Sequence, residues 1–166
     1  MAMGMYNAFV PPCIKGLTAL GKIMEKTAAH CEAKKIPEGV ILNTRLTPDM
    51  FSLAQQIGVA TQQVHWGCAL LAGLERPTLP NVEPTFADVK KRIDDAIAYA
   101  KSFKPEQIDG QEQRDVKLVF PARTLEFKGE GFLLNFTLPN FYFHYTTAYA
   151  ILRQAGVPIG KMDFLA

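Results

Sequence analysis

The strongest functional clue in this chain is a histidine within an aromatic-rich segment near the C-terminus. His144 lies in segment 138–153, whose composition favours a helix. At about 100° per residue, Asn140, His144 and Ile151 fall on one stripe of that helix. Because Ile151 marks the stripe as buried, its polar members need hydrogen-bonding partners. We therefore expect Asn140 and His144 to face the interior, with His65 on another helix as their partner.

Two interpretations of these residues remain open. An imidazole is a common metal ligand and a common acid or base, but His65 and His144 could equally be buried neutral imidazoles satisfied by their neighbours. Asn140 is either a ligand or an amide that bonds backbone groups, as an asparagine in a first helical turn commonly does. No nucleophile with an oriented base can be identified from the residues, so the sequence defines no reaction.

Length and charge restrict the class of protein. A chain of 166 residues predicts one domain, 1–166, that buries roughly two-thirds of its unfolded surface. The net charge is +2 and the basic residues are scattered, which argues against nucleic acid as a partner. No stretch reaches the roughly 18 apolar residues of a membrane span and the start lacks a signal-peptide pattern, so we expect no membrane partner and a cytoplasmic location.

The three cysteines show no redox or metal-binding spacing. Cys13, Cys31 and Cys68 form no CxxC pair, and on one continuous helix the first two would lie about 27 Å apart. We expect all three to be reduced core residues.

Apolar residues at steps of three and four predict two helices in the first half of the chain. The first covers 10–31, and Pro11–Pro12 should start or kink it. The second runs from about 48 to 74, with Thr47 as its N-cap and Pro48 at its first helical position.

The second half adds two more helices and a hairpin. Thr85 should cap a third helix that ends before Lys104. The apolar pattern then alternates over 116–120 and 125–127, which predicts a hairpin that packs on the bundle or on a second subunit. A fourth helix follows from about 137 to 154. Four long helices with apolar stripes make a bundle.

The end of the last helix, segment 148–158, and the order of the elements resemble the DinB-like (YfiT-like) metalloenzyme bundles. A closer resemblance, carried by segment 138–144 and the tail 160–165, is to a bacterial subfamily catalogued only as a domain of unknown function. It covers essentially the whole chain. It implies an all-α fold: a DinB-like four-helix bundle with a short β-hairpin between helices three and four.

The resemblance also implies a metal site. DinB-like proteins usually bind a divalent metal through three histidines, one on helix two and two at i, i+4 on helix four. Matching the helix ends places His65 at the first position, His144 at the last, and Asn140 where the remaining histidine would be. Since an amide oxygen is a weaker donor than imidazole for zinc or nickel, the predicted set of His65, Asn140 and His144 is a degenerate site.

Two functions follow from the resemblance. Some relatives at the superfamily level are metal-dependent thiol S-transferases or related isomerases, so the first expectation is an enzyme of that type that acts at a polar pocket. The alternative is a non-catalytic small-ligand-binding or dimeric structural protein that has lost the metal. In either case we expect a homodimer, because such bundles commonly pair and because Trp66, Tyr142 and Tyr149 exceed what one four-helix core easily absorbs.

Overall fold

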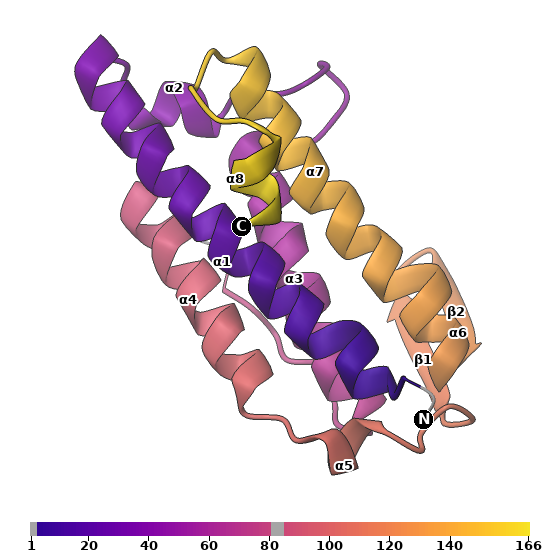
Figure 1. Cartoon of the computed structure of the whole chain (residues 1–166). Coiled ribbons are helices and arrows are strands. Elements are labelled where there is room, and N and C mark those ends of the chain that lie inside the picture. The colour runs from indigo at the N-terminus through magenta and orange to yellow at the C-terminus, as the bar shows by residue number, and fades with distance from the viewer. Residues whose placement is uncertain (1–2, 81–84) are drawn as a thin grey trace.

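The computed structural model describes residues 3–80 and 85–166, and its four long helices pack as a bundle (Figure 1). They are α1 (Met5–Lys34), α3 (Leu53–Leu71), α4 (Phe86–Lys101) and α7 (Leu138–Gln154). The shorter elements are α2 (Glu38–Leu42), α5 (Pro105–Ile108), β1 (Asp115–Phe120), β2 (Arg123–Lys128), α6 (Gly129–Phe132), the π-helical turn η1 (Leu133–Thr137) and α8 (Lys161–Leu165). The predicted all-α bundle with a hairpin before its last long helix is confirmed.

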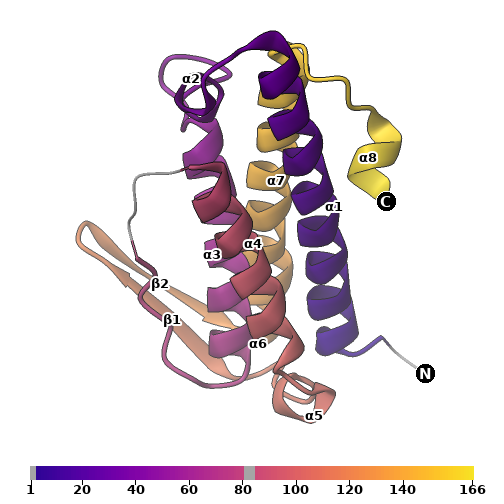
Figure 2. The ribbon, with the colours of Figure 1, turned by 90° about the vertical axis from the view of Figure 1, so that its left-hand side faces the viewer.

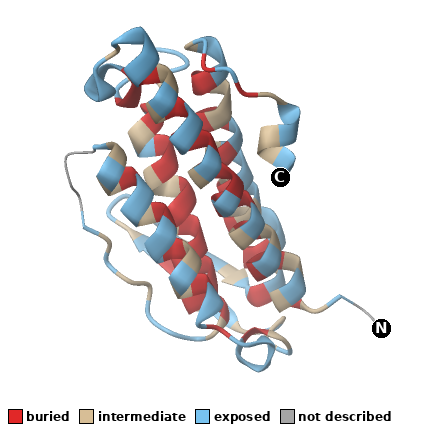
Figure 3. Cartoon of the chain, turned by 60° about the vertical axis from the view of Figure 1, so that its left-hand side comes forward, coloured by how far each residue is buried: buried red, intermediate tan, exposed pale blue. Residues whose placement is uncertain are grey.

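The core lies along the inner faces of the four long helices, where the buried residues gather (Figure 3). Its largest fully buried side chains include Phe9 on α1, Phe132 on α6, and Phe141 and Tyr145 on α7. Burying one such side chain contributes about 1.5–3 kcal/mol. None of the helices among the described residues is long and apolar enough to cross a membrane.

The first helix begins earlier than predicted and contains both prolines. Asp109, just after α5, accepts a 2.8 Å hydrogen bond from the backbone N–H of Tyr6. That carboxylate satisfies one of the free N–H groups at the start of α1 and stabilises the helix before Pro11. Pro11 and Pro12 therefore lie inside the helix and do not start it, and each lacks the N–H that would donate to the preceding turn.

The second long helix begins later than predicted. Its N-cap is Ser52, whose side chain accepts from the Gln55 N–H, while the Gln55 side chain accepts from the Ser52 N–H. This reciprocal pair is a capping box. The predicted cap, Thr47, instead donates to Asp49 within the preceding turn. The prediction of a start at Thr47–Pro48 is wrong because the box at Ser52 satisfies the first N–H groups five residues later.

The hairpin packs on the bundle beside α3, on the side away from α8 (Figure 2). Its register pairs Phe120 with Arg123 and so places Pro121–Ala122 in the turn. Trp66 of α3 packs against Phe120 at 6.4 Å between ring centroids. The hairpin thereby gains the apolar support that two strands alone lack.

The chain is helical from α6 through η1 into α7, so helical structure begins before the predicted start at about 137. The third long helix, by contrast, has its predicted cap. Thr85 and Asp88 form a capping box at the start of α4. Burial also confirms the prediction for the cysteines, since Cys13, Cys31 and Cys68 are all buried and free.

Gly67 of α3 should be required for the close approach of α1 and α7. A Cβ added there would overlap the ring of Phe9 and lie 3.0 Å from Oγ1 of Thr137. We expect Gly67→Ala to lower the free energy of unfolding by about 1–3 kcal/mol in urea denaturation, as overpacking does. The control is Gly39→Ala on α2, where an added Cβ meets nothing within 4 Å. Equal stability of the two variants would contradict this account of the helix packing.

Candidate functional site

His144 faces α3 and contacts Gln56 there. Its Nδ1 lies 2.6 Å from Oε1 of Gln56, while Nε2 of Gln56 donates to the backbone oxygen of Phe51 at 3.2 Å. Because the Gln56 nitrogen is engaged with Phe51, it is the amide oxygen that meets the imidazole, and an oxygen of this kind can only accept. Nδ1 of His144 therefore carries the proton and Nε2 keeps a lone pair.

The surroundings of His144 keep it neutral. The ring of Phe51 stacks on it at a centroid distance of 6.3 Å, and the ring of Phe143 meets it edge-on at 5.1 Å. Half-burial among these groups lowers the pKa of His144 below its ordinary value, because the imidazolium would lose hydration. A neutral imidazole with a free Nε2 can accept a hydrogen bond or a proton, or bind a metal ion.

Asn140 lies on the same face of α7, one turn before His144. The predicted inward stripe is confirmed further along the helix, where Thr147 and Ile151 are buried. Nδ2 of Asn140 donates to the backbone oxygen of Phe136 at 2.7 Å, which is the local backbone bond expected under the alternative interpretation. Among the described residues its Oδ1 makes no hydrogen bond, so this oxygen stays available to a ligand.

His65 lies elsewhere. Its Nδ1 donates to the backbone oxygen of Thr61 at 2.9 Å, and its ring stacks on Tyr99 of α4 at 4.8 Å. Burial lowers the pKa of His65, and this effect outweighs the bond to Thr61. Residue 65 follows residue 56 by nine positions, which is about 13.5 Å along the axis of α3 and about half a turn around it. The structure thus brings Asn140 and His144 to the α3–α7 seam, and it places His65 against α4.

The three residues predicted to form the metal site therefore do not converge in this structure. Across residues 3–80 and 85–166, no group of three or more His, Cys, Asp or Glu side chains could hold a metal ion. The donors at the α3–α7 seam are one imidazole and amides. Amide oxygens are poor ligands for zinc or nickel, so the residues present do not fit the three-imidazole set that the fold implies.

Gln56 is the member of the site that sequence reasoning missed. It is 1 % exposed and shares the inner face of α3 with the buried Ala60 and Val64. A glutamine at a buried helical position needs a partner inside the protein, and this was the available signal. We term Gln56, Asn140 and His144 the polar centre.

A pocket of about 540 Å³ is lined by segment 43–52 together with residues of α3 and α4, and none of the three residues of the polar centre lines it. Phe51 lines the pocket and also stacks on His144, so it connects the pocket with the polar centre. Arg45 and Arg92 contribute positive charge to the lining, against one carboxylate from Asp88. The volume lies within the usual range for small-molecule sites.

No cysteine serves as a nucleophile here. Burial raises the pKa of Cys68 to about 12, and burial together with the nearby Cys68 raises the pKa of Cys13 well above its ordinary value. The pKa of Cys31 is also raised by burial. These thiols stay protonated at neutral pH, so thiol chemistry would need an external thiol.

The comparisons with known proteins support the fold. The family described as "Domain of unknown function (DUF1993)" matches residues 5–165. The crystal structure of a DinB family member protein from Shewanella denitrificans is 33% identical in sequence and covers 97% of this chain and 91% of that chain, with a TM-score of 0.86. No curated protein matches the chain.

The two lowered histidine pKa values predict how stability depends on pH. Unfolded histidine titrates near about 6.5, whereas in the folded chain His65 and His144 protonate only at lower pH. The unfolded chain then binds more protons in that window, so the stabilisation is complete above pH about 6.5 and is lost as pH falls through the folded pKa values. Urea denaturation at several pH values should show a free energy of unfolding that rises with pH in this window. The slope should flatten when both residues are replaced by Gln, and an unchanged slope in that variant would refute the assignment.

Proposed function

The chain belongs to the DUF1993 family and to the DinB-like bundles, and on that premise we propose that it is a small-ligand-binding protein whose polar centre has replaced the family's metal site. The observation that carries the proposal is the Gln56 side chain, which donates to the backbone oxygen of Phe51 and accepts a hydrogen bond from Nδ1–H of His144. The proposed ligand is a small polar molecule that donates a hydrogen bond to the free Nε2 of His144.

The proposal assigns three tasks to the polar centre. Gln56 holds the ring of His144 in one tautomer, so the acceptor Nε2 is available without prior rearrangement. Asn140 adds a second acceptor, its free Oδ1, one helical turn away. Phe51 links this centre to the 540 Å³ pocket, where the rest of a ligand would lie beside Arg45 and Arg92.

The enzymatic alternative, a metal-dependent thiol transferase, has one observation in its favour. Asn140 and His144 stand at i, i+4 on one face, which is the spacing of two metal ligands on one helix. Each keeps an atom with a lone pair that could bind a metal ion, Oδ1 of Asn140 and Nε2 of His144. The residue of α3 that meets His144 is Gln56 and not a histidine. We therefore favour the binding protein over the enzyme.

Metal analysis separates the two functions. Protein purified without a metal-affinity tag should contain no stoichiometric zinc or nickel by elemental analysis. The physical reason is that one imidazole and two amides cannot compete with chelators for these ions. A stoichiometric transition metal that is lost in His144→Ala would overturn the proposal in favour of the metalloenzyme.

A designed variant tests the geometry of the polar centre. Gln56→His with Asn140→His should place three imidazoles at the α3–α7 seam together with His144. A ligand that binds only the folded chain stabilises it by about 2.7 kcal/mol at a hundredfold excess over Kd, so zinc should raise the melting temperature. The gain should be reversed by chelator and by His144→Ala, whereas His65→Gln should leave it unchanged.

Asn140→His alone is the control for this variant. With only two imidazoles at the seam, it should gain much less zinc stabilisation than the double variant. If Asn140→His alone suffices, and His65→Gln abolishes its effect, then His65 is the third ligand and the polar centre is wrongly composed.

The homodimer and the cytoplasmic location remain proposals. The aromatic residues that motivated the dimer have partners within the chain: Trp66 donates to the backbone oxygen of Pro77, and Tyr149 meets the ring of Phe164 edge-on. Phe143 is 55 % exposed, so apolar surface remains on α7 that a second subunit would cover. Sedimentation at micromolar concentration should give a dimer, and a concentration-independent monomer would exclude it.

A further inference from the structure

A second pocket lies on the opposite side of α7 from His144. It has a volume of about 410 Å³ and is enclosed by α1, α7 and α8. Its walls include Pro11, Pro12 and Lys15 of α1, Tyr142 and Tyr145 of α7, and Phe164 of α8. We term it the tail pocket. The polar centre contributes none of its lining, so the two sites can be tested separately.

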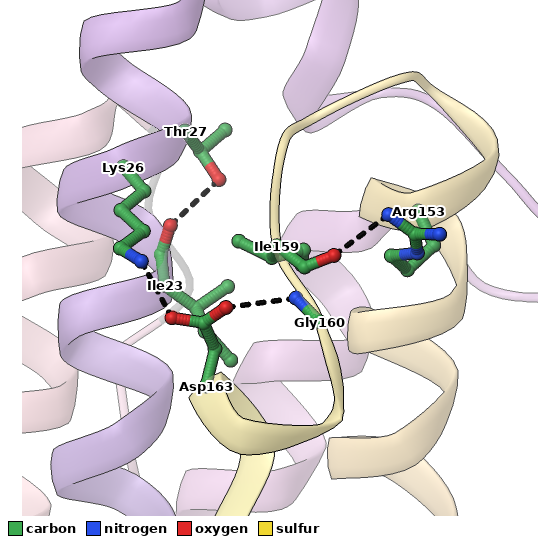
Figure 4. Close-up of polar contacts among 7 residues, drawn as sticks. All are labelled: Ile23, Lys26, Thr27, Arg153, Ile159, Gly160 and Asp163. Atoms are coloured by element: carbon green, nitrogen blue, oxygen red, sulfur yellow. Dashed lines mark hydrogen bonds and ion pairs between the residues drawn. The ribbon is translucent and has the colours of Figure 1, made fainter. Parts of the chain in front are cut away.

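The third wall of the tail pocket is the C-terminal segment, which polar contacts fasten to the bundle (Figure 4). Asp163 accepts from Lys26 of α1 at 2.6 Å and from the backbone N–H of Gly160 at 2.7 Å. Arg153 of α7 donates to the backbone oxygen of Ile159 at 2.7 Å. These contacts hold α8 in one position, so the pocket is formed before any ligand arrives.

Two rings that stack on each other form part of the wall of the tail pocket. The ring of Phe164 stacks on Tyr145 at 4.1 Å with 8° between the planes, and the Tyr145 hydroxyl donates to the Phe164 backbone oxygen at 2.7 Å. Gly16 of α1 leaves room for two rings of α7, since an added Cβ would lie 2.9 Å from Phe141 and 3.3 Å from Tyr145. Aromatic rings and proline faces of this kind favour a planar apolar ligand.

Charge narrows the chemistry of the ligand. Lys15 is the only charged residue among those that line the pocket. It is exposed, and within the described part of the chain it forms no ion pair. The exposed Asn7 adds an amide to the rim. An apolar slot with one unpaired cation at its edge complements a flat molecule that carries one negative charge.

We propose that the tail pocket binds a small planar aromatic carboxylate. The ring lies against Pro11, Pro12 and Tyr142, and the carboxylate meets the ammonium group of Lys15. Binding here is independent of His144 and of any metal.

The test compares 1-naphthoate with 1-naphthylmethanol, which has the same ring system without the charge. Isothermal titration of the full chain should show tighter binding of the carboxylate. Lys15→Gln should weaken naphthoate binding about fivefold and leave the alcohol unaffected, because a partly exposed ion pair contributes modestly. The matched control is Lys22→Gln, which removes the same charge from an exposed position two turns along α1.

A second pair of variants tests the aromatic wall. Tyr142→Ala should weaken both ligands about tenfold, whereas Phe143→Ala, an exposed aromatic outside the pocket, should weaken neither. Both positions are partly exposed, so both variants should fold. The proposal is overturned if wild type binds neither compound, if it binds both equally, or if Lys15→Gln behaves like Lys22→Gln. Gln56 and His144 variants should keep naphthoate binding, so failure at one site is not failure at the other.

Discussion

The arrangement of this protein depends on one constraint: a polar side chain that is fully buried beside α3 and α7 must find a hydrogen-bond partner there. Gln56 is nearly inaccessible, and it meets the requirement by donating to the Phe51 backbone and accepting from His144. Thr137 meets it by donating to the backbone oxygen of Gln63 at 3.1 Å. A buried amide without such bonds would cost about 1–3 kcal/mol. The two contacts therefore fix how α7 lies along α3.

The same constraint determines the chemistry that is available. The Gln56 oxygen accepts a hydrogen bond from Nδ1–H of His144, which leaves Nε2 as the acceptor atom of the neutral ring. The aromatic rings on either side reduce its hydration and reinforce the neutral form. The hydrogen bond that the buried Gln56 requires thus leaves an imidazole whose Nε2 can accept a hydrogen bond from a bound molecule. That is why the polar centre, more than the pocket beside it, carries the proposed function.

The likeness to a DinB family member concerns the fold of the bundle. The match extends over nearly the whole chain, and within the chain the polar side chains nearest His144 are amides, Gln56 across the seam and Asn140 one turn earlier on α7. Amides preserve the hydrogen bonds that the seam needs, and they weaken any affinity for transition metals. On the proposed function, the hydrogen bond between Gln56 and His144 holds the two helices together where a metal ion would otherwise join them.

The sequence by itself determined the local features. Apolar periodicity indicated the four long helices, alternation indicated the hairpin, Thr85 marked the start of α4, and the stripe through His144 and Ile151 was predicted to face inward, as it does. Periodicity shows which face of a helix is buried, because that depends only on the residues of that helix.

Only the tertiary structure decided which polar residue of α3 meets His144. Gln56 and His65 are both buried on α3 but lie about half a turn and about 13.5 Å apart, and the sequence offers no means to choose between them. The choice depends on the rotation and axial register of α3 against α7 and α4. Both depend on contacts that the sequence does not reveal. The contact of Gly67 with Phe9 joins residues distant in the chain, and the capping box at Ser52 shifts the start of α3 by several positions.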